Sequence, residues 1–136
     1  DTEIEKVKKL SGVKKRKEAY KEFIKVTSNA SKMDQLLKVY GYEPNTMDEA
    51  QKEITLEGEV EADPTQFLQY ATDKNLEHQA FINDCLTTEV LRKVGNTILN
   101  GDVSLGDSME EAILFIKDKK NSDVLTTLKA RLKTFS

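Results

Sequence analysis

Apolar side chains recur every three or four residues along most of the chain, which is the spacing of one buried helix face. One such stripe, within residues 13–26, consists of Ala19, Tyr20, Phe23 and Ile24. Residues that favour helix starts precede the later stripes, namely Ser31, Thr46, Asp63 with Pro64, Asn75, Thr87 or Thr88, Ser108 and Ser122. The pattern predicts an all-α fold: a single irregular bundle of about seven or eight short helices, forming one domain over residues 1–136.

The helical pattern is interrupted at two places in the first half of the chain. Ser11 and Gly12 separate the first two stripes, which favours a break between two helices. In residues 57–62, acidic side chains alternate with other residues, which is the period of a strand. We therefore expect a helix that ends near Leu56 and an extended acidic connection after it.

Residues 97–105 allow two interpretations. Asn100-Gly101 lies between alternating apolar residues, which is a strong signal for a β-hairpin. The run 88–100, however, has clean helical spacing. The expected structure is a helix that ends at Asn100-Gly101, and one small β-hairpin is the alternative.

Composition limits the class of protein. The chain has 136 residues, the size of one ordinary domain, and its 38% hydrophobic and 33% charged residues permit only a thin core. The longest apolar run, residues 112–116, is far shorter than the roughly 20 residues of a membrane span. A single cysteine excludes an internal disulfide and favours an intracellular, cytoplasmic location. Because the chain begins at Asp1, an earlier targeting segment would leave no trace.

Charge is segregated along the chain. Residues 1–40 hold 11 Lys/Arg and 6 Asp/Glu, whereas residues 41–111 hold 4 and 16. Residues 1–27 therefore form a basic N-terminal helical segment, and its centre reads Lys14, Lys15, Arg16, Lys17. The predicted partner-binding residues are Lys8, Lys9, Lys14, Lys15, Arg16, Lys17, Tyr20, Lys21 and Phe23.

A basic segment of this kind has several interpretations. It can be a solvated helix face or a protein contact, and lysines can also bind the phosphates of a nucleic acid. A nuclear-import signal and a membrane surface are further alternatives. The net charge of −12 over residues 41–111 opposes nucleic acid by long-range repulsion.

Residues 100–111 resemble a calcium-binding loop in part. Counted as a 12-residue loop between two predicted helices, its ligand positions are Asn100, Asp102, Ser104, Ser108 and Glu111, all bearing oxygen. The glycine required at the sixth position is replaced by Leu105. A helix cap at Ser108 also accounts for two of these residues.

No catalytic or cofactor motif emerges from the sequence. His78 and Cys85 share one predicted helix face, but Cys85 falls in an apolar stripe, where cysteines are usually inert. The single histidine and cysteine cannot supply a four-ligand zinc site. The six glycines form no phosphate-binding pattern. We therefore expect no enzyme activity, no cofactor and no metal.

The sequence favours a non-enzymatic interaction or assembly subunit that acts through charged helical surfaces, of the kind found in viral or phage complexes. A nucleic-acid-binding accessory protein is the first alternative, and a calcium-responsive helical protein using residues 100–111 is the second. Because the basic and acidic segments lie in one chain, salt-sensitive self-association through residues 10–27 is also expected.

Overall fold

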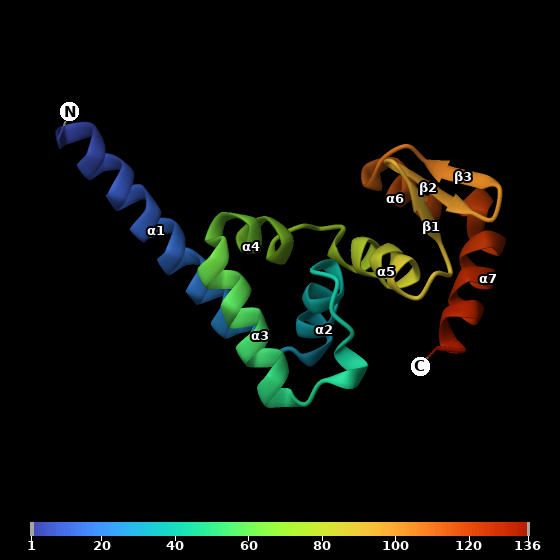
Figure 1. Cartoon of the computed structure of the whole chain (residues 1–136), viewed down its shortest axis with the longest axis horizontal. Helices are drawn as coiled ribbons and strands as arrows, with labels where there is room; N and C mark the ends of the chain where they lie inside the picture. Colours follow the sequence, from blue (N-terminus) through green and yellow to red (C-terminus); the bar gives the residue numbers. More distant parts are fainter. Residues whose placement is uncertain (1, 136) are drawn as a thin grey trace.

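The computed structural model describes residues 2–135. Its α-helices are α1 (Thr2–Thr27), α2 (Ala30–Val39), α3 (Glu49–Ala62), α4 (Pro64–Ala71), α5 (Leu76–Thr87), α6 (Met109–Lys117) and α7 (Ser122–Lys133). Two short 3-10 turns, η1 (Pro44–Thr46) and η2 (Lys119–Asn121), and three strands, β1 (Arg92–Val94), β2 (Thr97–Asn100) and β3 (Val103–Gly106), complete it. Figure 1 shows an elongated molecule in which α1 projects from one end and α7 lies at the other. The fold is mostly helical, as predicted, but it also contains a three-stranded sheet.

Helix α1 is continuous through Ser11 and Gly12, so the predicted break is wrong. A glycine inside a helix costs only about 1 kcal/mol relative to alanine. The surrounding lysine and glutamate residues are good helix formers, and their propensity outweighs the effect of Ser11 and Gly12. The helix ends at Thr27, and Asn29 caps the next one by accepting a hydrogen bond from the Lys32 amide at 3.1 Å.

Helix α3 begins and ends differently from the prediction. Its cap is Asp48, which forms a reciprocal capping box with Gln51, and not Thr46. It continues to Ala62, without an extended connection after Leu56. The reason is packing: Leu56 and Val60 lie one helical turn apart and are both buried. The next helix, α4, starts at Asp63-Pro64 as predicted, with the Asp63 carboxylate accepting from the amide three residues on.

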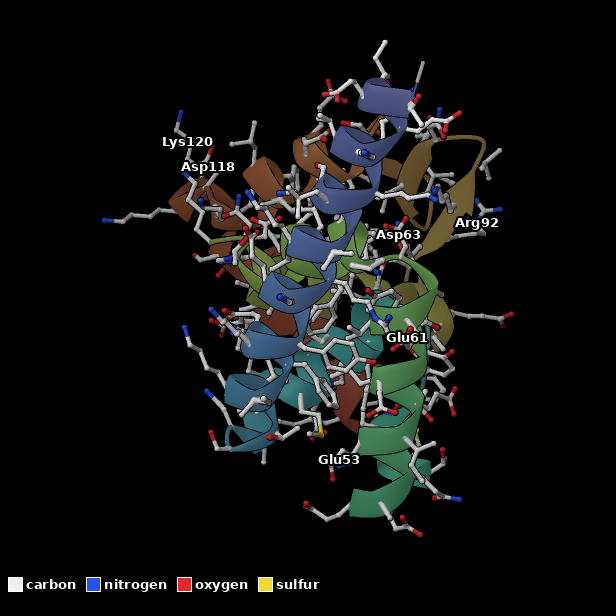
Figure 2. The ribbon with its side chains drawn as sticks, turned by 90° about the vertical axis from the view of Figure 1, so that its left-hand side faces the viewer. Glu53, Glu61, Asp63, Arg92, Asp118 and Lys120 are labelled. Atoms are coloured by element: carbon white, nitrogen blue, oxygen red, sulfur yellow. The ribbon has the colours of Figure 1, made fainter. Side chains whose placement is uncertain are left out.

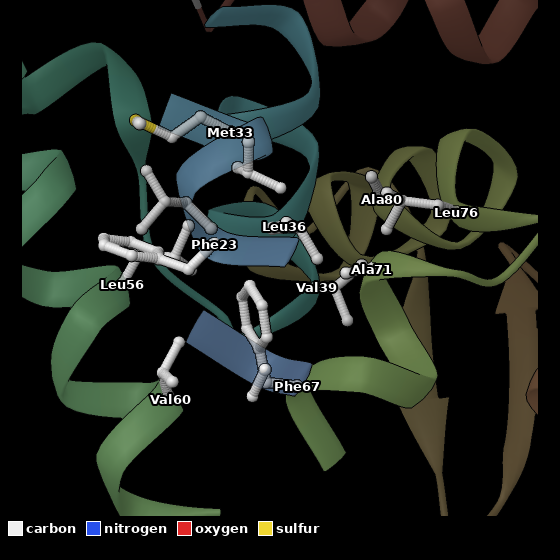
Figure 3. Packing of buried hydrophobic residues seen from close by; sticks show 13 residues of the cluster. Phe23, Met33, Leu36, Val39, Leu56, Val60, Phe67, Ala71, Leu76 and Ala80 are labelled. Carbon is white, nitrogen blue, oxygen red and sulfur yellow. The ribbon is translucent and has the colours of Figure 1, made fainter. Parts of the chain in front are cut away.

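A first hydrophobic cluster joins α1, α2, α3 and α4 with the start of α5. Its buried members are Ala19, Phe23, Val26, Met33, Leu36, Leu37, Val39, Leu56, Val60, Phe67, Ala71, Leu76 and Ala80. Figure 3 shows Phe67 at the centre of this cluster, and its ring meets Phe23 edge to face at a centroid distance of 6.4 Å. Only the C-terminal third of α1 contributes to the cluster.

Residues 92–106 form the sheet, so the predicted helix ending at Asn100-Gly101 is wrong. The strands follow the order β1-β2-β3, both pairs are antiparallel, and the pairing shifts between Ile98 and Leu99. Two-residue turns join them, and Gly95 and Gly101 have a φ of +62°. Glycine reaches this conformation without a steric penalty, so the Asn-Gly signal identified one of the two turns.

A second hydrophobic cluster lies between the sheet, α6, α7 and the end of α5. It is built from Ile82, Cys85, Val90, Leu91, Ile98, Leu105, Ala112, Ile113, Ile116 and Leu128. Helix α5 therefore carries residues of both clusters, and polar contacts join it to α2. The Asn83 amide donates to the Val39 carbonyl at 3.0 Å, and Lys38 pairs with Asp84 at 3.0 Å. Between residues 2 and 135, none of the helices combines the length and apolarity needed to cross a bilayer.

Candidate partner-binding surface

The N-terminal two thirds of α1, residues Thr2–Glu18, stand away from the rest of the protein, and we call this segment the basic arm. Every residue of the basic arm is exposed. It carries seven Lys/Arg and three Glu, and its apolar side chains Ile4, Val7, Leu10 and Val13 are 49–65% exposed. Exposed apolar residues in this number on one helix are characteristic of surfaces that contact another molecule.

One face of α1 has the heptad spacing of a helix-pairing surface. Leu10, Val13, Lys17, Tyr20 and Ile24 lie at intervals of three and four residues, which places them along one side. We call these five residues the seam. Leu10 is 55%, Val13 49% and Ile24 67% exposed, and side chains from Val13 to Ile24 line a shallow, mostly apolar hollow.

The positions that flank the seam are basic. In heptad terms they are Lys9, Lys14, Arg16 and Lys21, which lie at the borders of a helix–helix contact and influence the choice of partner. A molecule that covers the seam therefore meets four apolar or aromatic side chains and Lys17, with Lys14 and Lys21 along one border and Lys9 and Arg16 along the other.

An ion pair and a hydrogen bond hold the base of the arm against α3. Arg16 Nη2 lies 2.7 Å from Glu61 Oε1, and the Tyr20 hydroxyl donates to the same carboxylate oxygen. The Arg16 guanidinium also lies over the Tyr20 ring, 5.8 Å from its centroid. Figure 2 shows α1 and α3 side by side, with Glu61 labelled on α3.

These contacts change the titration of all three groups. The hydrogen bond from Tyr20, followed by that from Arg16, lowers the pKa of Glu61. The same carboxylate raises the pKa of Tyr20 and of Arg16, because it stabilises their protonated forms. At neutral pH the Glu61 carboxylate is therefore ionised and paired with Arg16.

The structure gathers most, not all, of the predicted partner-binding residues on this surface. Lys8, Lys9, Lys14, Lys15, Arg16 and Lys17 lie on the basic arm, Lys21 is exposed one turn further on, and Tyr20 is half-buried on the seam. Phe23 is the exception: it is only 5% exposed and belongs to the first hydrophobic cluster. Its predicted place on a partner-binding surface is wrong because α4 and α3 pack on that side of α1.

The outer side of α3 presents the opposite charge. Glu49, Glu53 and Glu57 are exposed there around Ile54, which is 72% exposed, and we call these four residues the acidic face. This surface was not identified in the sequence analysis. The sequence signal for this surface is the pair Glu53 and Glu57, which border Ile54 on the helix. Acidic side chains are almost never fully buried, so an apolar residue between two of them is more often exposed.

The calcium-loop interpretation of residues 100–111 fails on its structural premise. The segment does not connect two helices, because Asn100 ends β2 and Ser104 lies within β3. Ser108 caps α6 by accepting from the Glu111 amide at 3.1 Å, and the Glu111 carboxylate accepts from the Asp107 amide. Within residues 2–135, no three His, Cys, Asp or Glu side chains come together as a metal site would require.

The cysteine and histidine of α5 do not form a reactive pair. Cys85 is fully buried in the second hydrophobic cluster, and burial followed by the charge of Asp84 raises the pKa of its thiol to about 12. The thiol is therefore protonated at neutral pH and is a poor nucleophile. His78 lies half-buried on the same helix.

A cavity of about 650 Å³ opens between η1, α5 and α7. Its walls mix apolar side chains, such as Phe81 and Leu132, with the ion pair of Lys38 and Asp84. Lys38 and Asp84 neutralise each other, so this ion pair gives the cavity no preference for a charged ligand.

Comparison of the chain with protein-family models, with curated proteins and with solved structures finds no match. Function is therefore inferred from the basic arm, the seam and the acidic face.

Proposed function

We propose that the protein is a non-enzymatic interaction subunit whose basic arm and seam bind an acidic helical surface of a protein partner. The observation that carries this proposal is the exposure of every residue from Thr2 to Glu18 in a helix that bears both apolar side chains and lysines. A surface of this composition offers a partner hydrophobic burial together with charge selection.

The physical cost of the basic arm supports a binding role. Most protein helices gain their stability from packing against the rest of the fold and not from helix propensity. Every residue of the arm is exposed, so packing contributes little to its stability, and it contains Gly12 and the β-branched residues Ile4, Val7 and Val13, which lower helix propensity. A partner that buries the seam would supply the missing stabilisation.

The apolar seam favours a protein over a nucleic acid. Phosphates are recognised by charged and polar groups, and such binding does not require Leu10, Val13 or Ile24. These side chains would remain in water on a phosphate backbone. In a helix–helix contact they become the buried centre, and Lys14 and Lys21 border it.

A site-specific cross-link tests this role. A photo-cross-linking amino acid placed at Val13 should capture a partner from an extract of the source cells or virions. The same amino acid at Val103 is the matched control, because Val103 is 60% exposed but lies on the sheet at the far end of the molecule (Figure 1). Protease and nuclease digestion of the product identify its class.

The expected result is a protein adduct from position 13, absent at position 103, that is lost when Leu10 is changed to Ser. Equal labelling at both positions, or none at position 13, would contradict the proposal. An adduct that nuclease removes, and that survives Leu10→Ser, would instead identify a nucleic-acid-binding protein that uses lysines alone.

A further inference from the structure

We infer that the seam of one molecule docks on the acidic face of a second copy, so that copies join head to tail. This inference rests on the proposed function and names the partner: the surface that the seam requires is present on the chain itself. The argument depends on three properties of α1 and α3, namely charge, shape and the separation of the two surfaces.

The charges of the two helices are complementary. Residues 2–27 carry nine Lys/Arg and four Glu, whereas residues 48–63 carry seven Asp/Glu and one Lys. Docking would place Lys14 and Lys21, which flank the seam, beside Glu53 and Glu57 of the other copy. Pairing of opposite charges at these border positions favours this contact over others.

The same charges oppose a symmetric pairing of two arms. In an arm-on-arm contact, Lys9, Lys14 and Lys21 of one copy would face lysines of the other, and Lys17 would lie at the centre of the seam. Like charges at these positions disfavour the complex. The seam therefore favours an acidic surface and disfavours pairing with the seam of a second copy.

The shape of the acidic face suits an approaching helix. Ile54 stands between Ala50 and Gly58, one turn away on either side, and a Cβ added at Gly58 would meet open space. Small residues beside one large apolar residue let two helix backbones approach closely. The seam spans residues 10–24 and α3 spans Glu49–Ala62, so their lengths match.

The contacts within one molecule leave both surfaces accessible. The molecule's own α1 reaches α3 through Arg16, Tyr20 and Glu61, yet Ile54 remains 72% and Ile24 67% exposed. A molecule can therefore use its seam and its acidic face at the same time. Because the two surfaces differ, the contact does not close on itself in a dimer and extends into chains or rings.

Two triple variants make this inference testable. The arm variant is Leu10→Ser, Val13→Ser, Lys14→Gln, and the face variant is Glu53→Gln, Ile54→Ser, Glu57→Gln. All six side chains are exposed, so both variants should keep the far-ultraviolet circular dichroism of the wild type. Each variant retains one intact surface, and no variant gains a charge that could create a new pairing.

Sedimentation velocity and multi-angle light scattering measure the outcome at about 50 mM salt. The wild type should exceed twice the 15.4 kDa of one chain at concentrations on the order of 100 μM, because a single helix pair is a small interface. This association should weaken at about 500 mM salt, where charges are screened over a few ångströms. Each variant alone should remain a monomer.

The equimolar mixture is the decisive sample. The face variant supplies an intact seam and the arm variant an intact acidic face, so the mixture should form a one-to-one dimer that cannot grow. A monomeric wild type, an associating face variant or a monomeric mixture would each overturn the inference. A monomeric wild type whose position 13 still cross-links to another protein would leave the proposed function standing without it.

Discussion

Replacing Gly106 with alanine should destabilise the protein, whereas the same replacement at Gly58 should stabilise it. Gly106 ends β3 where the backbone runs against the start of α6. A Cβ at this position would lie 2.5 Å from the Cβ of Glu111 and 2.9 Å from the backbone nitrogen of Ala112. Ordinary contacts between such atoms lie near 3.5–4.0 Å, so one of the two segments must move by about 1 Å.

The helix cannot move freely, because polar contacts fix its first turn. Ser108 accepts from the Glu111 amide, and the Glu111 carboxylate accepts from the Asp107 amide. Overpacking of this kind costs about 1–3 kcal/mol. At Gly58 the added methyl group meets open space inside a helix, where alanine is favoured over glycine by about 0.5–1 kcal/mol.

Thermal unfolding followed by circular dichroism at 222 nm measures both changes, since the chain contains no tryptophan. For a chain of this size, each kcal/mol should move the melting temperature by about 3–5 °C. The two variants should therefore shift in opposite directions. Unchanged stability in Gly106→Ala, or equal shifts in the two variants, would refute the packing of β3 against α6.

Four further outcomes follow from particular side chains. Glu61→Gln should lower the pKa of Tyr20 toward its ordinary value in an NMR titration, because the carboxylate that stabilises the phenol is lost; an unchanged titration would show that the two groups do not meet. In the wild type this contact should persist at neutral pH and fail in acid, as the pH falls through the lowered pKa of Glu61. The Cys85 thiol, with a pKa of about 12, should react with a disulfide reagent at pH 8 at least roughly 100-fold more slowly in the native state than in urea, and equal rates would contradict its burial. Phe67→Ala should cost about 3–5 kcal/mol, whereas the exposed Ile24→Ala should cost under about 0.5 kcal/mol, and a small loss at Phe67 would contradict its central place in the first cluster.

The helices with clear caps and buried stripes could be predicted from the sequence, and the exceptions have physical reasons. Asp63-Pro64 and Ser108 start α4 and α6 as expected, because cap chemistry is local. The sheet was anticipated only as a small β-hairpin, the alternative to a helix, because buried Leu91, just before β1, and Ile98 of β2 also fit a helical interval. Gly95 and Gly101, which both have positive φ, each stand in a two-residue turn. Taken together, these two turns favour strands over a helix, whereas one turn alone predicts only a hairpin.

The candidate surface was predictable only in part. Clustered lysines identify the basic arm in the sequence, because charge is visible without the fold. Burial cannot be read from the sequence in the same way. Phe23 and Ile24 are neighbours, yet Phe23 is 5% and Ile24 67% exposed. Which side of α1 meets α3 and α4 depends on tertiary packing. The acidic face has a partial signal in the sequence, the glutamates that border Ile54, but only the packing of α3 shows that this side is exposed.

The division of the interior into two hydrophobic clusters has a consequence for synthesis on the ribosome. The first cluster draws only on residues from 19 to 80 and the second only on residues from 82 to 128, so their contacts do not interleave along the chain. The first can therefore close while the sheet and α7 are still inside the exit tunnel. The buried residues of α5 from Ile82 onward would then be in place before the strands form and pack against them. Native-state hydrogen exchange should accordingly resolve two opening units that meet within α5.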